Sequence, residues 1–310
     1  MQVEAELAEV SPQKDMLLAI GVFDGVHLGH KHLLSQLRES AKQRDLLSGV
    51  ITFKQHPRAV LSSRVELPYL TSLEGKTRLI KNEGIDSVIV LSFNKELSQI
   101  GARQFIELLQ KHLRMRGLVL GADFVLGRNR EGDIPTLKRL GKEMGFSVDV
   151  VPPLQIAGEI VSSTAVREAL AKGNMRKATA LLGRPFSVSG CVIKGEGRGV
   201  GLGFPTANLE IDHRHILPAD GVYATLAYID SKAYPSVTNI GRNPTFDAKS
   251  RTVETHILNY KRDLYGCEMT IDIVERLRPE KRFENVDELK KQMTADVKQG
   301  KEVLESLSAR

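Results

Sequence analysis

The hydrophobic pattern of the chain changes near residue 184. Before that point, nearly continuous apolar runs alternate with segments whose apolar residues recur at helical spacing, such as Phe105, Leu108, Leu109 and Leu113 within 101–113. Apolar strands separated by amphipathic helices are typical of a parallel sheet that is covered on both faces. The sequence therefore predicts an α/β, doubly wound domain with strands near 16–23, 48–53, 86–93, 118–124 and 146–152.

Beyond residue 184, apolar and polar residues alternate with a period of two, and Gly and Pro interrupt the pattern. This pattern is typical of antiparallel strands, so the second half is expected to form a small β-barrel or sandwich. A final amphipathic helix that packs on it is indicated by Val286, Leu289, Met293 and Val297. Because 310 residues exceed one average domain, we expect two domains, 1–183 and 184–310.

The composition limits the classes of protein that the chain can belong to. Hydrophobic residues make up 41% and charged residues 26%, which suits a buried core and argues against disorder. No apolar run approaches the ~18 residues of a membrane span, and the acidic start of the chain does not resemble a signal peptide. The two cysteines, Cys191 and Cys267, are too few for a disulfide framework. We therefore expect a cytoplasmic protein without a membrane partner.

The net charge of +6 lies entirely within residues 1–184. Such a surplus suits anionic small molecules as well as nucleic acid. There is no block of Lys and Arg, and only 5% of the residues are aromatic, so the stacking surfaces of single-strand binders are poorly supported. A solvated surface of mixed charge is the simpler interpretation, and no nucleic-acid partner is expected.

The stretch FDGVHLGH, residues 23–30, lies between the first predicted strand and the first predicted helix. Its glycines permit a tight turn, and the start of a helix offers free N–H groups to a phosphate. His27 and His30 are three residues apart and can both donate hydrogen bonds to phosphate oxygens. A metal pair or two structural histidines are the alternatives. The position after the first strand of a parallel sheet favours phosphate, and no G-x-G-x-x-G fingerprint is present.

Three further segments follow predicted strands or open a predicted helix. In VSSTAVREAL, residues 161–170, the hydroxyl side chains suit a helix N-cap, and Arg167 lies one turn further on. By itself this is an ordinary helix start, but beside the histidine turn it suggests a second part of a triphosphate site. The loops TFKQHP, 52–57, and GADFVLGRNREGD, 121–133, follow apolar strands and are expected at the same edge of the sheet.

The second half carries a glycine-rich segment, GEGRGVGLGFPTAN, at 195–208. Its backbone can surround phosphates, although it lacks the G-K-[ST] ending of a Walker A motif. Thr206 and Asn208 alternate on a predicted strand, so their oxygens face one side and suit Mg²⁺. In VETHIL, 253–258, Glu254 faces away from Val253 and Ile257 and is a candidate general base. An ordinary turn and a surface glutamate are the alternatives, and His256 is given no role.

Together these motifs resemble those of the prokaryotic bifunctional riboflavin kinase/FMN adenylyltransferases, or FAD synthetases. The resemblance also covers LPADGVYA (217–224), NIGRNPTF (239–246), DLYG (263–266) and RLRPEKRF (276–283), in the order expected of that family. It implies a Rossmann-like nucleotidyltransferase domain followed by an antiparallel β-barrel kinase domain with a terminal helix. It further implies that ATP phosphorylates riboflavin to FMN, and that a second ATP adenylylates FMN to FAD and pyrophosphate.

The resemblance assigns roles in the first half residue by residue. His27, His30 and Arg167 are expected to be catalytic, with the histidines on the phosphates and Arg167 at the β/γ end together with Ser163 and Thr164. Asp24 orients the turn or assists Mg²⁺, Asp123 and Phe124 line the flavin side, and Asn129 and Arg130 are weaker candidates there. The expected nucleotide- and flavin-binding residues of this half are Gly21, Phe23, Asp24, Gly25, Gly29, Asp123, Phe124, Asn129, Ser163 and Thr164.

In the second half, the resemblance makes Glu254 the group that accepts the proton of the ribityl hydroxyl. Thr206 and Asn208 are the implied Mg²⁺ ligands, and Gly195, Gly201, Gly203 and Pro205 the implied nucleotide-binding residues. The partners are then riboflavin, FMN and ATP, and a weak homo-oligomer stays open.

Three other functions were weighed. Another adenylyltransferase would leave the β-rich half unexplained, and a tRNA synthetase would need a KMSKS-like loop that the sequence lacks. A flavin-binding module without catalysis is disfavoured because Thr206, Asn208 and Glu254 are all present.

Overall fold

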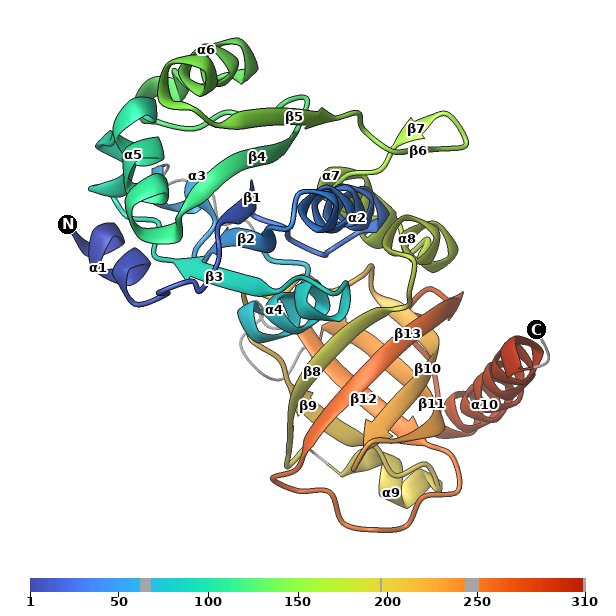
Figure 1. Ribbon diagram of the computed structural model, residues 1–310. Helices are drawn as coiled ribbons and strands as arrows, with labels where there is room; N and C mark the ends of the chain where they lie inside the picture. The colour runs from blue at the N-terminus through green and yellow to red at the C-terminus, as the bar shows by residue number, and fades with distance from the viewer. Residues whose placement is uncertain (62–67, 196, 243–250, 309–310) are drawn as a thin grey trace. The chain divides into compact units, whose positions relative to one another are not determined.

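The computed structural model describes residues 1–61, 68–195, 197–242 and 251–308. The chain divides into two compact units, Met1–Ser162 and Ser163–Arg310, which are drawn in Figure 1 and described separately below. No helix in these ranges is long and apolar enough to cross a membrane.

The first unit is built on a five-stranded parallel sheet with the strand order β3-β2-β1-β4-β5. Its strands match the predicted apolar runs, except that β4 begins earlier because Met115 and Gly117 pair with Met16 and Leu17 of β1. The bounds are β1 Met16–Ile20, β2 Leu47–Phe53, β3 Ser87–Leu91, β4 Met115–Gly121 and β5 Ser147–Val151.

Successive residues of β1 enter two different hydrophobic cores, one on each face of the sheet. Met16, Leu18 and Ile20 pack with α1 (Gln2–Ala8), α5 (Ala102–Leu113) and α6 (Ile134–Met144), while Leu17 and Ala19 pack with α2 (Leu28–Gln43) and α4 (Leu73–Asn82). The predicted doubly wound sheet is confirmed, and so is the helix over 101–113 with its buried Phe105, Leu108, Leu109 and Leu113. The short elements are α3 Pro57–Leu61, η1 Leu97–Gln99, η2 Arg128–Arg130, β6 Gln155–Ile156 and β7 Glu159–Ile160.

The second unit begins with two helices and continues as a closed antiparallel barrel with the strand order β10-β11-β12-β9-β8-β13. The predicted barrel is thus confirmed. The helices are α7 Ser163–Ala171, α8 Met175–Leu182, α9 Arg198–Leu202 and α10 Val286–Ser308. The strands are β8 Phe186–Ile193, β9 Ala207–Glu210, β10 Gly221–Ile229, β11 Lys232–Arg242, β12 Arg251–Ile257 and β13 Glu268–Arg278.

The barrel interior contains a row of hydroxyl groups as well as apolar side chains. Thr225, Ser236, Thr238 and Thr255 are fully buried. The hydroxyl oxygen of Thr225 lies 2.7 Å from that of Ser236 and 2.8 Å from that of Thr238, which in turn lies 3.0 Å from that of Thr255. Ser236 also donates to the carbonyl of Thr225 at 3.0 Å. We call these four residues the hydroxyl ladder; it crosses strands β10, β11 and β12.

The terminal helix α10 packs on β10, β11 and β13, as predicted. Val286 is 61% exposed, whereas Leu289, Met293 and Val297 are half-buried, so the predicted apolar face is correct except at its first residue. The contact lies further along, where Asp296 forms an ion pair with Arg278, Gly300 lies close to Val237, and Leu304 is buried.

Candidate active sites

The order of the strands creates a site in the first unit. From β1 the chain moves outward to β2 and β3, and then returns to place β4 on the other side of β1. Ligands of open α/β sheets bind at such a reversal, beyond the carboxyl ends of the strands. The segment 23–30 follows β1, and the segment 122–133 follows β4. The strand order therefore brings the histidine turn and the loop after β4 to one edge of the sheet.

The turn between β1 and α2 has an unusual backbone. Phe23, Gly25 and Val26 all have positive φ angles, of 52°, 83° and 38°. This conformation suits glycine but strains a β-branched residue, so the surrounding contacts must hold it in place. Asp24 supplies one such contact, because its buried carboxylate accepts hydrogen bonds from the backbone N–H groups of Leu70 (2.9 and 3.1 Å) and Thr71 (3.2 Å). Asp24 therefore orients the turn.

The two histidines of the turn lie face to face. Their rings stack at 3.6 Å, and the Phe23 ring meets His30 edge-on at 5.1 Å. His27 caps α2, because its Nδ1 accepts the backbone N–H of His30 at 3.2 Å. An accepting Nδ1 carries no proton, so His27 presents Nε2–H as its donor. Phe23 itself is part of a hydrophobic core, so its contact with His30 packs the His30 ring against that core.

His30 is held neutral. Removal from water lowers the pKa of its imidazole well below 6.5, and the neighbouring His27 and the charge of Lys76 lower it further. Its buried Nδ1 has no hydrogen-bond partner among the described residues. An unpaired buried nitrogen is costly, so a ligand atom that pairs with it is favoured.

The predicted triphosphate residues divide between the two units. The carbonyl of Val161 lies so close to Gly29 that a side chain there would be 2.9 Å from it. The backbone just before Ser162 therefore touches the first turn of α2. Ser163 and Thr164 open α7, and Arg167 lies one turn further along it. Because α7 belongs to the second unit, the approach of these three residues to the histidines stays a prediction.

The residues expected on the flavin side follow β4. Asp123 is exposed, whereas Phe124 is half-buried and packs against the core of the first unit. Asn129 and Arg130 are exposed in η2 with left-handed φ angles of 55° and 61°. At the end of β1, Gly21 donates its N–H to the carbonyl of Ile51 at 3.0 Å and lies against the Phe23 ring.

A lysine that the sequence analysis passed over also reaches this edge. Lys76 lies on α4, is only 6% exposed, and donates to the carbonyls of Val22 and Phe53, both at 3.0 Å. Burial lowers the pKa of its ammonium group to about 8, against the opposing effect of the Asp24 carboxylate. A lysine within an amphipathic helix usually faces solvent, so the sequence carries no signal for this contact.

In the second unit, the register of the barrel places Glu254 directly opposite Asn208. Val253, Thr255 and Ile257 point into the barrel, so Glu254 lies on its outer face, as expected. Directly opposed residues of antiparallel strands have Cβ atoms about 5 Å apart and share one face. Thr206 lies immediately before β9 and two residues before Asn208, so the period of two along a strand places both on the same face. On the other side of β12, Glu254 pairs with Asn239 of β11. The sequence analysis did not select Asn239.

The glycine-rich segment folds back onto these residues. A side chain at Gly195 would overlap the amide group of Asn208, and one at Gly199 would overlap the carbonyl of Phe204 and lie 3.4 Å from Thr206 Oγ1. Gly201 and Gly203 instead face open space, and Gly203 has a φ of 88°. The segment thus lies against Thr206 and Asn208 on one side and leaves its backbone accessible on the other. Residues 243–246 of NIGRNPTF lie outside the described residues.

His256, which was given no role, contacts the end of this segment. Its Nδ1 lies 2.8 Å from the carbonyl oxygen of Pro205, and its ring meets that of Phe204 edge-on at 5.4 Å. A carbonyl oxygen only accepts, so Nδ1 is the donor. His256 therefore holds the backbone directly before Thr206. Its place two residues after Glu254, on the same face of the strand, was the available signal.

Comparisons with known proteins assign both units. A family model described as FAD synthetase matches residues 9–165, and one described as riboflavin kinase matches residues 182–304. The bifunctional riboflavin kinase/FMN adenylyltransferase of Escherichia coli (strain K12) is 39% identical over 288 residues, covering 92% of each chain. The chain belongs to this family. The riboflavin kinase/FMN adenylyltransferase of Listeria monocytogenes is 34% identical over 282 residues, covering 90% of each chain.

A solved structure supports the same fold. The crystal structure described as a macrolide-efflux protein from Streptococcus pneumoniae superposes with a TM-score of 0.89, at 28% identity and over 97% of each chain. The predicted family, the two-part fold and the two activities of a bifunctional riboflavin kinase/FMN adenylyltransferase are confirmed by these matches. The roles of single residues remain predictions and are taken up next.

Proposed function

We propose that the two activities of the chain occupy two separate sites, adenylyl transfer at the histidine turn and riboflavin phosphorylation on the outer face of the barrel. One observation carries this assignment: each compact unit holds its own polar cluster at the position where its fold presents a ligand. His27 and His30 lie at the strand reversal of the first unit, and Glu254 lies opposite Asn208 in the second.

Adenylyl transfer needs no general base, because the FMN phosphate is already a nucleophile. One of its oxygens attacks the α-phosphorus of ATP, the bond to the bridging oxygen breaks, and pyrophosphate leaves. The task of the site is to align the groups and stabilise the developing charge. We assign His27 Nε2–H and the neutral His30 to the phosphates, and Ser163, Thr164 and Arg167 to the β/γ end. The backbone of Gly21, Gly25 and Gly29 borders the nucleotide, whereas Asp123, Phe124 and Asn129 face the flavin.

Phosphorylation of riboflavin requires a held hydroxyl and a neutralised triphosphate. The ribityl 5′-oxygen attacks the γ-phosphorus, its proton passes to the Glu254 carboxylate, and ADP leaves. Gly195, Gly201, Gly203 and Pro205 border the phosphates, and His256 keeps Pro205 in place.

Mg²⁺ is the cofactor proposed for the kinase site. The side-chain oxygens of Thr206 and Asn208 suit this cation, which prefers oxygen ligands and accepts few from the protein. The packing of the glycine-rich segment supports the assignment. Gly195 has no side chain, and the space that a side chain would occupy there holds the amide group of Asn208. When bound, the ion neutralises phosphate charge.

We propose 1–183 as the adenylyltransferase domain and 184–310 as the kinase domain, with α7 and α8 as the connection between them. The compact units divide earlier, at Ser162, because α8 packs against β8 and β13. The kinase family model begins at residue 182, which supports the later boundary. The macrolide-efflux name of the pneumococcal structure is not carried over, because the family models and the curated relatives all describe flavin enzymes.

The proposed partners are riboflavin, FMN and ATP, without a nucleic acid and with at most a weak homo-oligomer. The cytoplasm is the proposed location, since both cysteines are free thiols and ATP is a cytoplasmic substrate. Sedimentation at several concentrations and a salt-titrated gel shift test these assignments.

The two-site assignment is tested by separating the activities in the full-length protein. Glu254→Ala is expected to lower FMN formation by about 10²–10⁴-fold and to leave FAD formation from FMN intact, because it removes only a proton acceptor. His30→Ala should do the reverse, by about 10²–10³-fold. Chromatography that resolves riboflavin, FMN and FAD over time measures both.

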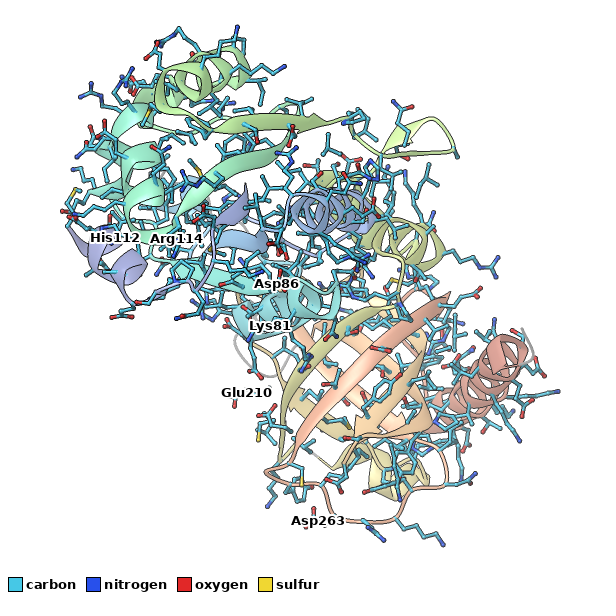
Figure 2. All side chains as sticks on the ribbon, viewed as in Figure 1. Lys81, Asp86, His112, Arg114, Glu210 and Asp263 are labelled. Atoms are coloured by element: carbon cyan, nitrogen blue, oxygen red, sulfur yellow. The ribbon has the colours of Figure 1, made fainter. Side chains whose placement is uncertain are left out.

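Two labelled residues in Figure 2 supply matched controls. Glu210 is an exposed glutamate on β9, and His112 lies on α5, on the sheet face opposite α2. Glu210→Ala and His112→Ala should retain both activities. If Glu254→Ala or His30→Ala silenced both reactions in a folded protein, the separation into two sites would be wrong.

A further inference from the structure

A buried ammonium group lies beneath the histidine turn and has no part in the reaction described above. Lys76 extends from α4 to the carboxyl edge of the sheet, where it donates to the carbonyls of Val22 and Phe53, both at 3.0 Å. Val22 directly precedes the turn, and Phe53 is the last residue of β2. The Val22 carbonyl also accepts the hydroxyl of Thr52 at 3.0 Å. One cation thus joins the ends of two neighbouring strands at the ligand-binding edge.

The same short stretch of chain holds the turn at a second point. Asp24, inside the turn, accepts the backbone N–H groups of Leu70 and Thr71, and Lys76 follows in the first turns of α4. The Asp24 carboxylate thus binds the segment before α4, and the Lys76 ammonium group on α4 binds the carbonyl that precedes the turn. Both side chains are 6% exposed, and the Asp24 charge favours the protonated form of Lys76. Lysine is almost never so buried without a compensating partner.

The charge of Lys76 is also felt by the histidines. It disfavours the protonated form of His30, in addition to burial and the neighbouring His27. The ionisable groups whose charge interacts with that of Lys76 in the described structure are Asp24 in the turn and His30 in α2. Lys54, beside Phe53, instead pairs with Glu6 at 3.3 Å.

We propose that Lys76 is a positioning residue for adenylyl transfer: it fixes the ends of β1 and β2 under the histidine turn, and its charge adds to burial in keeping His30 neutral. The inference rests on the proposed role of His30 in that reaction. A neutral His30 retains the same protonation state throughout the physiological pH range, so its contact with a phosphate does not vary with pH. The hydrogen bonds from Lys76 to the carbonyls of Val22 and Phe53 hold the strained turn in one position relative to the ends of β1 and β2.

The first test compares Lys76→Met with Lys81→Met, a matched change at an exposed lysine of the same helix, labelled in Figure 2. Loss of the two carbonyl contacts is expected to lower kcat/KM for FAD formation about a hundredfold, since small displacements of a catalytic group have effects of this size. FMN formation by the same full-length protein should not change, and neither activity should change in Lys81→Met. A folded Lys76→Met protein that retained FAD formation within about threefold of the original would overturn the proposal.

The second test reads the charge directly. NMR titration of isotope-labelled histidine should show that His30 titrates at a higher pH in Lys76→Met than in the unchanged protein. A purely structural lysine would leave that titration where it was. This readout does not depend on the reaction: if His30→Ala kept full FAD formation, the proposed function would fail while the coupling between Lys76 and His30 stood. An unmoved His30 titration would instead reject the coupling alone.

The third test covers the case in which Lys76→Met does not fold. Burial lowers the pKa of Lys76 to about 8, and the neutral amine that forms above this pH donates weaker hydrogen bonds to the carbonyls of Val22 and Phe53 than the ammonium group does. We therefore expect kcat/KM for FAD formation to fall as the pH rises above about 8. In Lys76→Arg the charge persists, because arginine does not lose its proton in this range. The alkaline decline should therefore disappear in this variant. A decline that was unchanged in folded Lys76→Arg would contradict the inference.

Discussion

At the scale of single residues, the kinase site depends on a position where no side chain fits. Gly195 lies directly against the amide group of Asn208, and Asn208 lies opposite Glu254. The proposed metal ligand and the proposed base are therefore both held by backbone geometry around a glycine. A change that alters neither group chemically still affects both.

Gly195→Ala tests this dependence. The added methyl group would overlap the Asn208 side chain, so one of the two must move. We expect FMN formation to fall at least tenfold and the Mg²⁺ concentration for half-maximal rate to rise, since a displaced ligand weakens the metal site. FAD formation from FMN, performed by the other unit, is the internal control. Unchanged Mg²⁺ dependence in the variant would separate Gly195 from the metal ligands.

At the scale of elements, the barrel contains a buried polar network, the hydroxyl ladder, that the apolar pattern of its strands does not reveal. The hydroxyl ladder joins β10, β11 and β12 through fully buried oxygens. Each buried hydroxyl must find a partner in the correct neighbouring strand, so a shift in strand register would leave several unpaired. The ladder therefore favours one register of the barrel.

Thr238 is the residue to change, because its hydroxyl is bonded to those of both Thr225 and Thr255. Thr238→Val should lower the free energy of unfolding of the barrel by about 1–3 kcal/mol, because two buried oxygens lose a partner. Thr270→Val is the matched control, since Thr270 pairs with Ser189 at 2.8 Å on the exposed outer face. Urea unfolding measures both, and equal losses would mean that burial of the ladder has no special effect.

The elements also show where sequence reasoning works and where it stops. The strands of the sheet were predictable because the residues of β1 are buried on both faces and read as one apolar run. The helical face of 101–113 was predictable because its leucines repeat at helical spacing. The pairing of Asn208 with Glu254 was not, since strand partners distant in sequence are set by tertiary packing. Lys76 was missed for a similar reason: its buried state depends on two carbonyls contributed by other strands.

At the scale of the whole molecule, the first unit carries several carboxyl groups whose charge contributes to its stability. The pKa is lowered in Glu4, Glu6, Asp15, Asp133 and Glu143. In Glu4, Asp15 and Glu143 the main cause is a hydrogen bond from a basic side chain. A carboxyl group with a lowered pKa stabilises the fold above its unfolded pKa, and this stabilisation is lost as the pH falls through the folded pKa. Acid should thus weaken the first unit.

Glu143→Gln isolates one such group. Hydrogen bonds from Arg139, at 2.7 Å, and from Arg103 lower the pKa of this carboxyl below its ordinary value of 4.5. The variant should unfold at a slightly lower temperature than the original protein at pH 7, because both contacts lose the charge. The difference should shrink as the pH falls through the lowered pKa of the Glu143 carboxyl, because the original side chain then becomes protonated as well. Calorimetry checks this, with the exposed Glu107→Gln on α5 as the control. A difference that persisted in acid would show that charge is not its source.

Closure of the barrel has a consequence for how the kinase half behaves apart from its ligands. Since β10 pairs with both β11 and β13, the ring has no terminal strand in the described structure. Open sheets expose an unpaired row of main-chain groups on which a foreign chain can build, and this is a common route to aggregation. A ring offers no such template. The half of the enzyme that makes FMN is therefore protected by its topology once the barrel has closed. The sheet of the other half keeps two edge strands, β3 and β5, whose outer main-chain groups need another form of protection.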